Sequence, residues 1–331
     1  MNSQTIVKNI SIDTLFRENY NKTISTNFIL DLPEPIEKVI SMRISALELP
    51  NVWRAFSDID KTNTFKITIY NFYQLNNTTM ENELISKREF VINIPPGNYT
   101  SLNFENMINA YFVNNGNGLE YLYCNIDQIT TKTTFRVYSA SDGGTNIDPF
   151  DPYNLQYYSP NFYYTLDFSN DDKSRPVYEK TGWMLGFKKE FYSVNGSNTY
   201  IATGLPNINN ELIKFYAYID SESSYGNSVY PYVYLDIDEY RSNIRSDSLY
   251  NFFGTNSEQL LNNNILARIS ISSSQNTIII DNGSDRIFKQ RNYLAPVTIE
   301  KLHIKLLNRF GNVINLIKND YSFLLEITYL Q

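Results

Sequence analysis

Apolar residues alternate with polar ones along many short segments of this chain. That period of two is typical of a β-strand with one buried face, because successive side chains of a strand point to opposite sides. The alternation is clearest near the C-terminus, where residues 298–308 place Leu302, Ile304 and Leu306 on one face, and residues 321–329 repeat the pattern. A chain of such segments is expected to fold as packed sheets rather than as a helical bundle.

Turn-forming residues, mostly Asn, Pro and Gly, separate these segments. One stretch departs from the strand pattern, because Ser101–Phe112 has helical spacing and Ser101 can serve as its N-cap. Residues 140–180 are rich in Gly, Pro, Asp and Tyr and are predicted to form an extended surface loop. Strands are expected at residues 26–32, 38–49, 63–73, 87–94, 121–126, 133–138, 182–188, 212–219, 232–237, 266–272, 277–280, 298–308 and 321–329. This number and spacing would serve an eight-stranded jelly roll plus an inserted subdomain.

Charge and residue counts restrict the partners and the chemistry. The formal net charge is −7, which argues against a nucleic-acid-binding surface, since neutralising phosphates needs clustered Lys and Arg. The chain has one cysteine, Cys124, and one histidine, His303, so neither an internal disulfide nor a Cys/His zinc site can form. We expect no metal, no cofactor, no signal peptide and no membrane-spanning helix.

Few residues are candidates for catalysis. His303 would have to be the base of any Ser-His-Asp or Cys-His site, but its strand places it between two outward lysines. Cys124 has no histidine or arginine cluster nearby in sequence and is expected to be a buried thiol. The densest acidic cluster is Asp236, Asp238 and Glu239, which could chelate Ca²⁺ or Mg²⁺ but lacks the spacing of an EF-hand. Solvated carboxylates at a strand end are the simpler interpretation.

The predicted loop at residues 140–180 carries acidic pairs at 148–151 and 171–172, which a glycosidase would need at a fixed separation. It also carries tyrosines, which contribute large contact areas to protein interfaces. Those rings could instead pack the loop on its own body. The possible interface residues are Tyr157, Tyr158, Tyr163 and Tyr164.

Three stretches are distinctive when taken together. They are residues 28–51, which begin Phe-Ile-Leu-Asp-Leu-Pro; residues 234–240, Tyr-Leu-Asp-Ile-Asp-Glu-Tyr; and residues 293–311 with 320–326. They resemble the penton and minor capsid jelly-roll proteins of nucleocytoplasmic large DNA viruses, the giant viruses. The resemblance spans both ends of the chain and covers residues 75–230 poorly. Its motifs are strand and turn patterns, so it transfers no functional residue.

The resemblance implies an all-β fold, a jelly-roll β-sandwich with an inserted β-rich subdomain that contains one short helix. We expect an N-terminal arm at 1–24, the jelly roll at 25–75 and 210–331, and the insertion at 76–209. Within the arm, Ile12, Leu15 and Phe16 could form one amphipathic turn.

The same resemblance implies a structural virion protein and not an enzyme. Such a chain would assemble in the host cytoplasm as a homo-oligomer, most simply a pentamer at the vertex of an icosahedral capsid. It would contact the major capsid protein and other minor capsid proteins. One alternative is a carbohydrate- or receptor-binding module of a viral fibre or spike, because Tyr and Trp faces suit sugars. Another is a glycosidase that uses Asp236 and Asp238 as its carboxylate pair.

Overall fold

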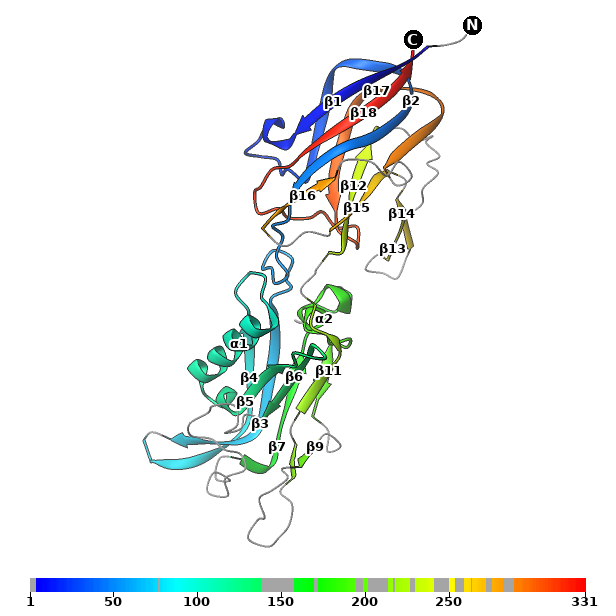
Figure 1. Ribbon diagram of the computed structural model, residues 1–331. Helices are drawn as coiled ribbons and strands as arrows, with labels where there is room; N and C mark the ends of the chain where they lie inside the picture. The colour runs from blue at the N-terminus through cyan, green and yellow to red at the C-terminus, as the bar shows by residue number, and fades with distance from the viewer. Residues whose placement is uncertain are drawn as a thin grey trace. The chain divides into compact units, whose positions relative to one another are not determined.

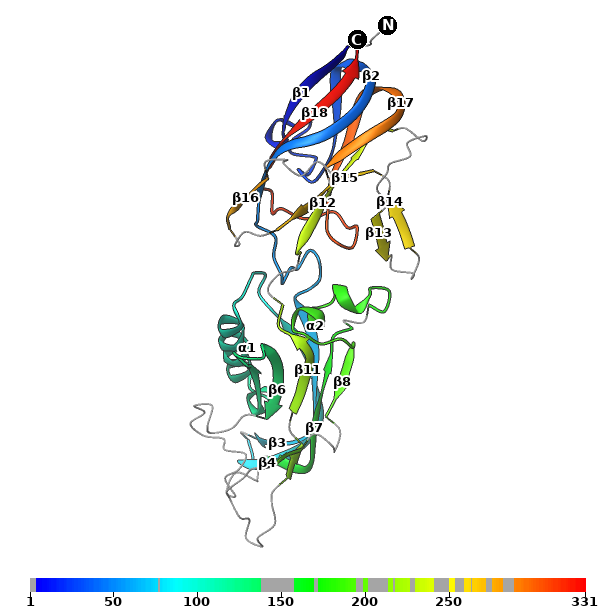
Figure 2. The ribbon, with the colours of Figure 1, turned by 45° about the vertical axis from the view of Figure 1, so that its right-hand side comes forward.

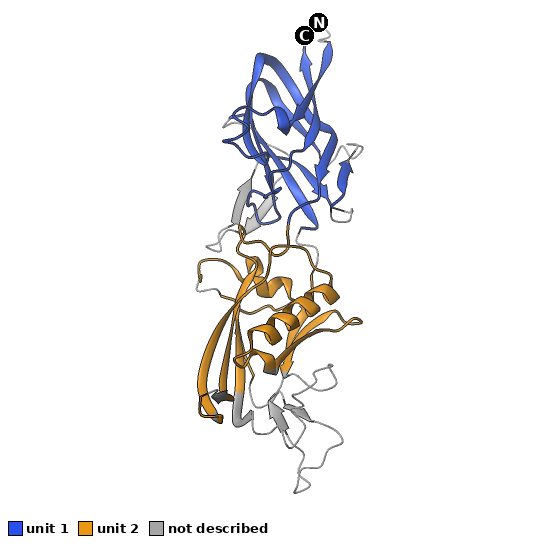
Figure 3. Ribbon diagram, turned by 90° about the vertical axis from the view of Figure 1, so that its left-hand side faces the viewer, with its two compact units in different colours: residues 1–53, 230–331 blue, residues 54–229 orange. Residues whose placement is uncertain are grey.

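The computed structural model describes residues 4–76, 78–137, 158–169, 172–194, 199–201, 214–216, 218–226, 230–240, 250–253, 259–262, 264–271, 276–281 and 289–331. The chain divides into two compact units, coloured separately in Figure 3. Unit 1 comprises residues 1–53 and 230–331, and unit 2 comprises residues 54–229. Unit 2 is therefore an insertion between Trp53 and Tyr230 of unit 1.

Unit 1 contains a seven-stranded sheet with the order β1-β18-β2-β17-β12-β15, and β16 pairs with β2 beside this path. A separate pair, β13 (Tyr250–Phe253) and β14 (Gln259–Asn262), also lies in this unit. The bounds of the seven strands are β1 Thr5–Asp13, β2 Asn27–Pro50, β12 Tyr232–Asp238, β15 Ile265–Ser270, β16 Ile278–Asp281, β17 Gln290–Leu307 and β18 Ser322–Leu330.

The long strand β2 contributes to two layers of a sandwich (Figures 1 and 2). Its first half pairs with the end of β17, and its second half pairs with β18 and, at residues 39–43, also with the start of β17. Register shifts interrupt the β2–β17 ladder, and such bulges bend strands. Pro33 and Pro35 fall between the paired positions Asp31 and Ile36, where a residue without an N–H costs no ladder hydrogen bond. The two strands expected at 26–32 and 38–49 are therefore one bent strand.

The interior of unit 1 is filled by the apolar faces predicted from the alternation. Strands β17 and β18 contribute every second residue, as expected for a half-buried strand. Fully buried side chains of these strands and their neighbours include Met42, Leu47, Val233, Leu235, Ile269, Leu302, Ile304, Leu306, Phe323, Leu325 and Ile327.

Unit 2 combines a four-stranded sheet, β4-β3-β7-β8, with a three-stranded sheet, β11-β6-β5, and a two-stranded pair, β10-β9. Its described helices are α1, Ser101–Asn115, and the single turn α2, Thr181–Met184. The strands are β3 Thr64–Asn76, β4 Glu81–Asn93, β5 Leu122–Ile126, β6 Lys132–Val137, β7 Tyr158–Asp167, β8 Phe191–Ser193, β9 Thr199–Ile201, β10 Lys214–Tyr216 and β11 Tyr218–Ser224.

Helix α1 packs on the edge strand β5 through polar side chains. Thr100 is the N-cap in place of the expected Ser101, and its side chain accepts a hydrogen bond from the backbone of Asn103. Asn109 accepts from the N–H of Cys124 and donates to the carbonyl of the same residue. The helix thus completes the hydrogen bonding of the strand edge that it covers.

Aromatic rings make up much of the core of unit 2. The rings of Phe168 and Phe187 stack with centroids 5.1 Å apart, and Phe135 lies 6.1 Å from Phe187. These separations are typical of packed aromatic pairs. The high Phe and Tyr content of the chain therefore serves an interior as well as a surface.

The expected all-β jelly-roll sandwich with a β-rich insertion is confirmed, and two described helices replace the single one expected. Residues 5–13 form β1 rather than a free arm, because all nine pair with β18 and Ile12 enters the core. Residues 54–75 and 210–229, placed in the jelly roll by prediction, belong to unit 2, where β3 pairs with β4 and β7, and β11 pairs with β6. Residues 182–188 form α2 and the following turn, not a strand. No described helix is long and apolar enough to cross a membrane.

Candidate assembly surface

Tyr164, one of the four predicted interface tyrosines, lies in the core of unit 2. It is fully buried, and its hydroxyl donates a hydrogen bond of 2.6 Å to the carbonyl of Phe135. Burial raises the pKa of Tyr164 well above its ordinary value. The prediction of an interface role for this residue is wrong, because strand β7 turns it inward.

The other three predicted interface tyrosines are Tyr157, Tyr158 and Tyr163. Tyr163 is half-buried, and its ring stacks on Tyr70 of β3 with centroids 4.2 Å apart. Tyr158 is the first residue of β7, but its side chain is outside the description. Tyr157 lies outside the described residues, as do residues 140–157 of the predicted loop. An interface role for these three stays a prediction.

The acidic candidates each face a basic side chain. Asp236 and Asp238 of β12 lie opposite Lys305 and His303 of β17, and Asp236 is buried with an oxygen 3.8 Å from Lys305 Nζ. Glu239 is buried against Arg291 of β17. No group of three potential metal ligands occurs among the residues that the structure describes. The cluster is thus structural in geometry rather than a carboxylate pair facing a substrate.

The remaining acidic pairs add no site. Asp172 holds its own loop, since its side chain accepts hydrogen bonds from the N–H and hydroxyl of Ser174. Asp171 and residues 148–151 lie outside the described residues. The suggested glycosidase pair therefore stays without structural support.

Neither of the two candidate bases or nucleophiles is poised for chemistry. The thiol of Cys124 is fully buried, and this burial raises its pKa well above the ordinary value, so it is a poor nucleophile. His303 Nε2 lies 2.7 Å from Asn27 Oδ1, and its ring stacks on Tyr240. Both side chains have structural neighbours in place of a reacting partner.

The two tryptophans do not favour sugar binding. Trp53 is buried and packs on Tyr230, with ring centroids 6.0 Å apart. Lys188 Nζ lies 3.5 Å above the ring of Trp183, so one face of that indole is covered. The aromatic platform expected for a carbohydrate module is not formed by either residue.

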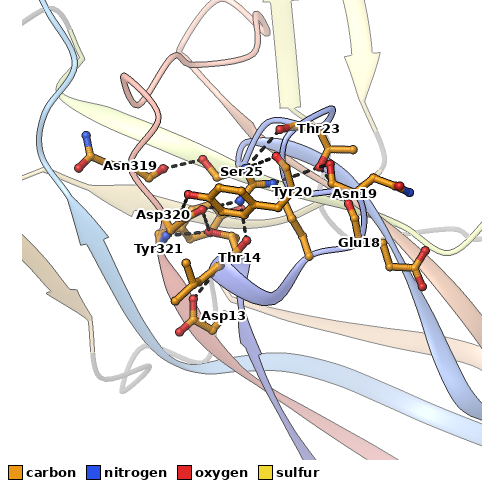
Figure 4. Close-up of polar contacts among 12 residues, drawn as sticks. Asp13, Thr14, Glu18, Asn19, Tyr20, Thr23, Ser25, Asn319, Asp320 and Tyr321 are labelled. Carbon is orange, nitrogen blue, oxygen red and sulfur yellow. Dashed lines mark hydrogen bonds and ion pairs between the residues drawn. The ribbon is translucent and has the colours of Figure 1, made fainter.

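The most unusual surface is the segment from Asp13 to Ser25, which leads from β1 to β2 (Figure 4). Arg17 is its anchor, and only 6% of the Arg17 side chain is exposed. Its guanidinium donates to Thr14 O at 2.6 Å and to Asp320 Oδ1 at 2.5 Å. Three further bonds go to the carbonyls of Tyr20 and Thr23 and to the hydroxyl of Thr23, all at 3.2 Å. All five N–H donors of Arg17 are therefore used.

The ends of the segment are fastened to residues 319–321, just before β18. Thr14 donates from its hydroxyl to Asp320 Oδ1 and accepts from the backbone N–H of Tyr321. The Ser25 hydroxyl donates to the carbonyl of Asn319 at 2.7 Å. We call residues 13–25 together with 319–321 the terminal clamp. It fixes the backbone of the segment at several points.

Apolar side chains on the clamped segment face solvent. The 3₁₀ turn Thr14–Phe16 is capped by Asp13, which accepts a hydrogen bond from the N–H of Leu15. Because Thr14 and Arg17 use the inner side, Leu15 and Phe16 between them point outward. Ile24 is exposed as well, and Tyr20 is exposed in part, with one face of its ring against the Arg17 guanidinium. The exposed fractions are 50% for Leu15, 81% for Phe16, 40% for Tyr20 and 55% for Ile24. We call these four residues the clamp patch.

Sequence reasoning found this surface only in part. The pattern of Ile12, Leu15 and Phe16 predicted one amphipathic turn, but the structure buries Ile12 and exposes the other two. Asp13 before Leu15 is a local signal for the capped turn. No local signal links Arg17 to Asp320, which is 303 positions away.

Comparisons with known proteins give a distant likeness. No family model and no curated protein matches the sequence. Among solved structures, the crystal structure of a selenomethionine-labelled mavirus penton protein is similar, with 10% identity over 99% of this chain and 100% of that chain. The TM-score is 0.43, so the likeness carries no argument about function. The class that the fold defines is a β-sandwich with an inserted β-rich unit.

Proposed function

We propose that this chain is a structural virion protein, a capsid component that forms homo-oligomers and occupies a vertex as a pentamer. The observation that supports it is the clamp patch, four exposed apolar side chains on a segment anchored by buried polar contacts. The resemblance of both chain ends to penton and minor capsid proteins supports the same class. Within the virion, the partners would be further copies of the chain, the major capsid protein and other minor capsid proteins.

The clamp patch has the physical properties of a binding surface. Phe16 alone is 81% exposed, and burying an aromatic ring of this size contributes about 2 kcal/mol or more to association. The anchored backbone lowers the conformational entropy lost on binding. Large exposed apolar groups on a rigid segment mark interaction sites more often than they serve a monomer.

A ring of identical chains needs two different surfaces that fit each other head to tail. The clamp patch would supply one of them, and its receptor would lie elsewhere on the neighbouring copy. Unit 2 would then be available for other capsid proteins. Assembly in the host cytoplasm fits a chain whose single thiol, Cys124, is reduced and buried.

The solution mass of the purified protein tests this proposal. A pentamer would have a mass of 192.5 kDa, five times the 38.5 kDa of the chain. Light scattering after size exclusion should give that mass for the wild type, or twice that mass where two rings associate, and one fifth of the wild-type mass for Phe16→Asp. Met80→Asp is the matched control, since Met80 is 74% exposed in unit 2. A wild type that stays monomeric at high concentration, or a Phe16→Asp variant that keeps the wild-type mass, contradicts the proposal.

A further inference from the structure

Strand β1 is an edge strand of the seven-stranded sheet. In the described part of the chain it pairs with β18 alone, through nine consecutive residue pairs from Thr5↔Leu330 to Asp13↔Ser322. Figures 1 and 2 both place it at the border of its layer. In an antiparallel ladder, alternate residues direct their N–H and C=O groups to the other side of the strand. The outer edge of β1 is therefore a template for another strand.

This edge lacks most of the features that prevent strand pairing. Natural edge strands are usually short, bulged or interrupted by Pro and charges. The nine pairs of β1 run without a register shift, whereas the β2–β17 and β2–β18 ladders both contain shifts. The strand Thr-Ile-Val-Lys-Asn-Ile-Ser-Ile-Asp has no Pro or Gly, and Lys8 is the one charge before its last residue.

The core-facing side of β1 is incompletely covered. Ile12 is buried, but Ile6 and Ile10, on the same side, are only half-buried. These residues pair with Tyr329 and Leu325 of β18 and have no described strand beyond them. A further strand with apolar residues at every second position would extend the layer and complete their burial.

We propose that this strand is β1 of a second copy, paired antiparallel across a two-fold axis at Asn9. That register uses all nine residues of both strands, so Thr5 lies opposite Asp13 of the other copy. On the core-facing side Ile6 meets the second copy's Ile12, and Lys8 meets its Ile10. The aliphatic stem of Lys can pack on Ile while its ammonium reaches water.

The register is self-complementary in charge as well as in shape. No two like charges stand directly opposite in this register. A register with the two-fold axis one residue earlier, at Lys8, would place Lys8 against Lys8 of the other copy. Like charges directly opposite destabilise a strand pair. This contact goes beyond the proposed pentamer, because it is two-fold and would join two chains whatever ring the clamp patch forms.

Disulfide trapping tests the register. Asn9 is exposed and would lie on the axis, so Asn9→Cys should form a disulfide-linked dimer with itself, at twice 38.5 kDa on a non-reducing gel. Val7→Cys and Ser11→Cys are the matched controls, because each would lie about 13 Å from its own copy. Neither should cross-link alone, and a mixture of the two should. The native Cys124 is buried and does not compete.

A charge swap tests the contact without a covalent bond. Asn9→Lys places two ammonium groups together on the axis and should halve the solution mass, and Asn9→Glu should do the same. Mixing the two variants should restore the wild-type mass. Urea unfolding of each variant verifies that the fold is kept.

The inference is overturned if Asn9→Cys gives no more disulfide dimer than Ser11→Cys, or if Asn9→Lys keeps the wild-type mass. Self-cross-linking of Val7→Cys and Ser11→Cys alone would indicate parallel strands and also overturn it. The Phe16→Asp result is independent of these outcomes. A failure of the strand contact can therefore be told apart from a failure of the proposed ring.

Discussion

Arg17 forms an ion pair with Asp320 across 303 positions of the chain, with Nη1 2.5 Å from Oδ1. Both side chains are largely buried, and Asp320 also accepts hydrogen bonds from the hydroxyls of Thr14 and Tyr20, each at 3.0 Å. The pair joins the segment after β1 to the segment before β18 (Figure 4). It thereby joins the chain beyond the Asp13↔Ser322 end of the β1–β18 ladder and supports the outward direction of the clamp patch.

Arg17→Ala is expected to lower the free energy of unfolding of unit 1 by about 2 kcal/mol, because it leaves Asp320 and several backbone carbonyls without their donor. Urea unfolding followed by Trp53 fluorescence measures this, since Trp53 is the single tryptophan of unit 1. Arg17→Lys should recover only part of the loss, because an ammonium cannot reproduce the planar fork. Equal stability of all three proteins would refute the anchoring role.

Tyr164→Phe is expected to lower the stability of unit 2 by about 1–2 kcal/mol. The variant keeps the ring but removes the donor to the buried carbonyl of Phe135. The fluorescence of Trp183, the single tryptophan of unit 2, reports that loss. The oligomeric mass should stay unchanged, because Tyr164 is a core residue. A change in mass with unchanged stability would instead return this residue to an interface.

The alternation of apolar residues was sufficient to predict most strands of unit 1. It located β12 and β18 within a residue or two, because each strand has one face in the core and the pattern is local. It divided β2 at Pro33 and Pro35, since the bulges that accommodate these residues depend on β17. It assigned residues 140–180 to an extended loop, whereas Tyr158–Asp167 form strand β7, and this missed strand is why the inward position of Tyr164 was not predicted.

The candidate surface was harder to predict than the fold. The exposure of Phe16 depends on Arg17 using every donor on the inner side, and Asp320 supplies one acceptor from the far end of the chain. The insertion bounds were missed for a similar reason. β3 looks like any alternating strand in sequence, and only its pairing with β4 and β7 places it in unit 2.

His303 is expected to titrate below its ordinary pKa of 6.5. Burial lowers its pKa, Lys305 lowers it further, and Asp236 and Asp238 oppose the shift. A lowered pKa in the folded state means that the unfolded chain binds the proton first. The contribution to stability is therefore complete above pH 6.5 and is lost as the pH falls through the folded pKa.

The pKa of His303 can be measured by proton NMR without assignment, because the chain has a single histidine and its imidazole signals are unique. His303→Gln should remove part of the fall in urea midpoint between pH 7.5 and 5.5, because no imidazole then has to be protonated on unfolding. A midpoint that falls equally in both proteins, with an NMR pKa at or above 6.5, would contradict the expectation.

The insertion of unit 2 between two neighbouring residues of unit 1 predicts that the units can be separated. The rings of Trp53 and Tyr230 are 6.0 Å apart, so a Gly/Ser linker of about six residues can replace residues 54–229 without strain. Unit 2 has internal contacts near both ends of its segment. The backbones of Phe56 and Gly97 pair near the start, and the Tyr225 hydroxyl near the end donates to the carbonyl of Tyr99.

The shortened chain is expected to fold and to keep the same number of copies as the full chain, because the clamp patch lies in unit 1. Light scattering gives the number of copies, and the fluorescence of Trp53 gives the fold. Residues 54–229 expressed alone should unfold cooperatively, with Trp183 as the probe, and stay monomeric. If the shortened chain folds but is monomeric while the full chain is oligomeric, the contacts that build the oligomer lie in unit 2, and the Phe16→Asp variant of the full chain should then have no effect on mass.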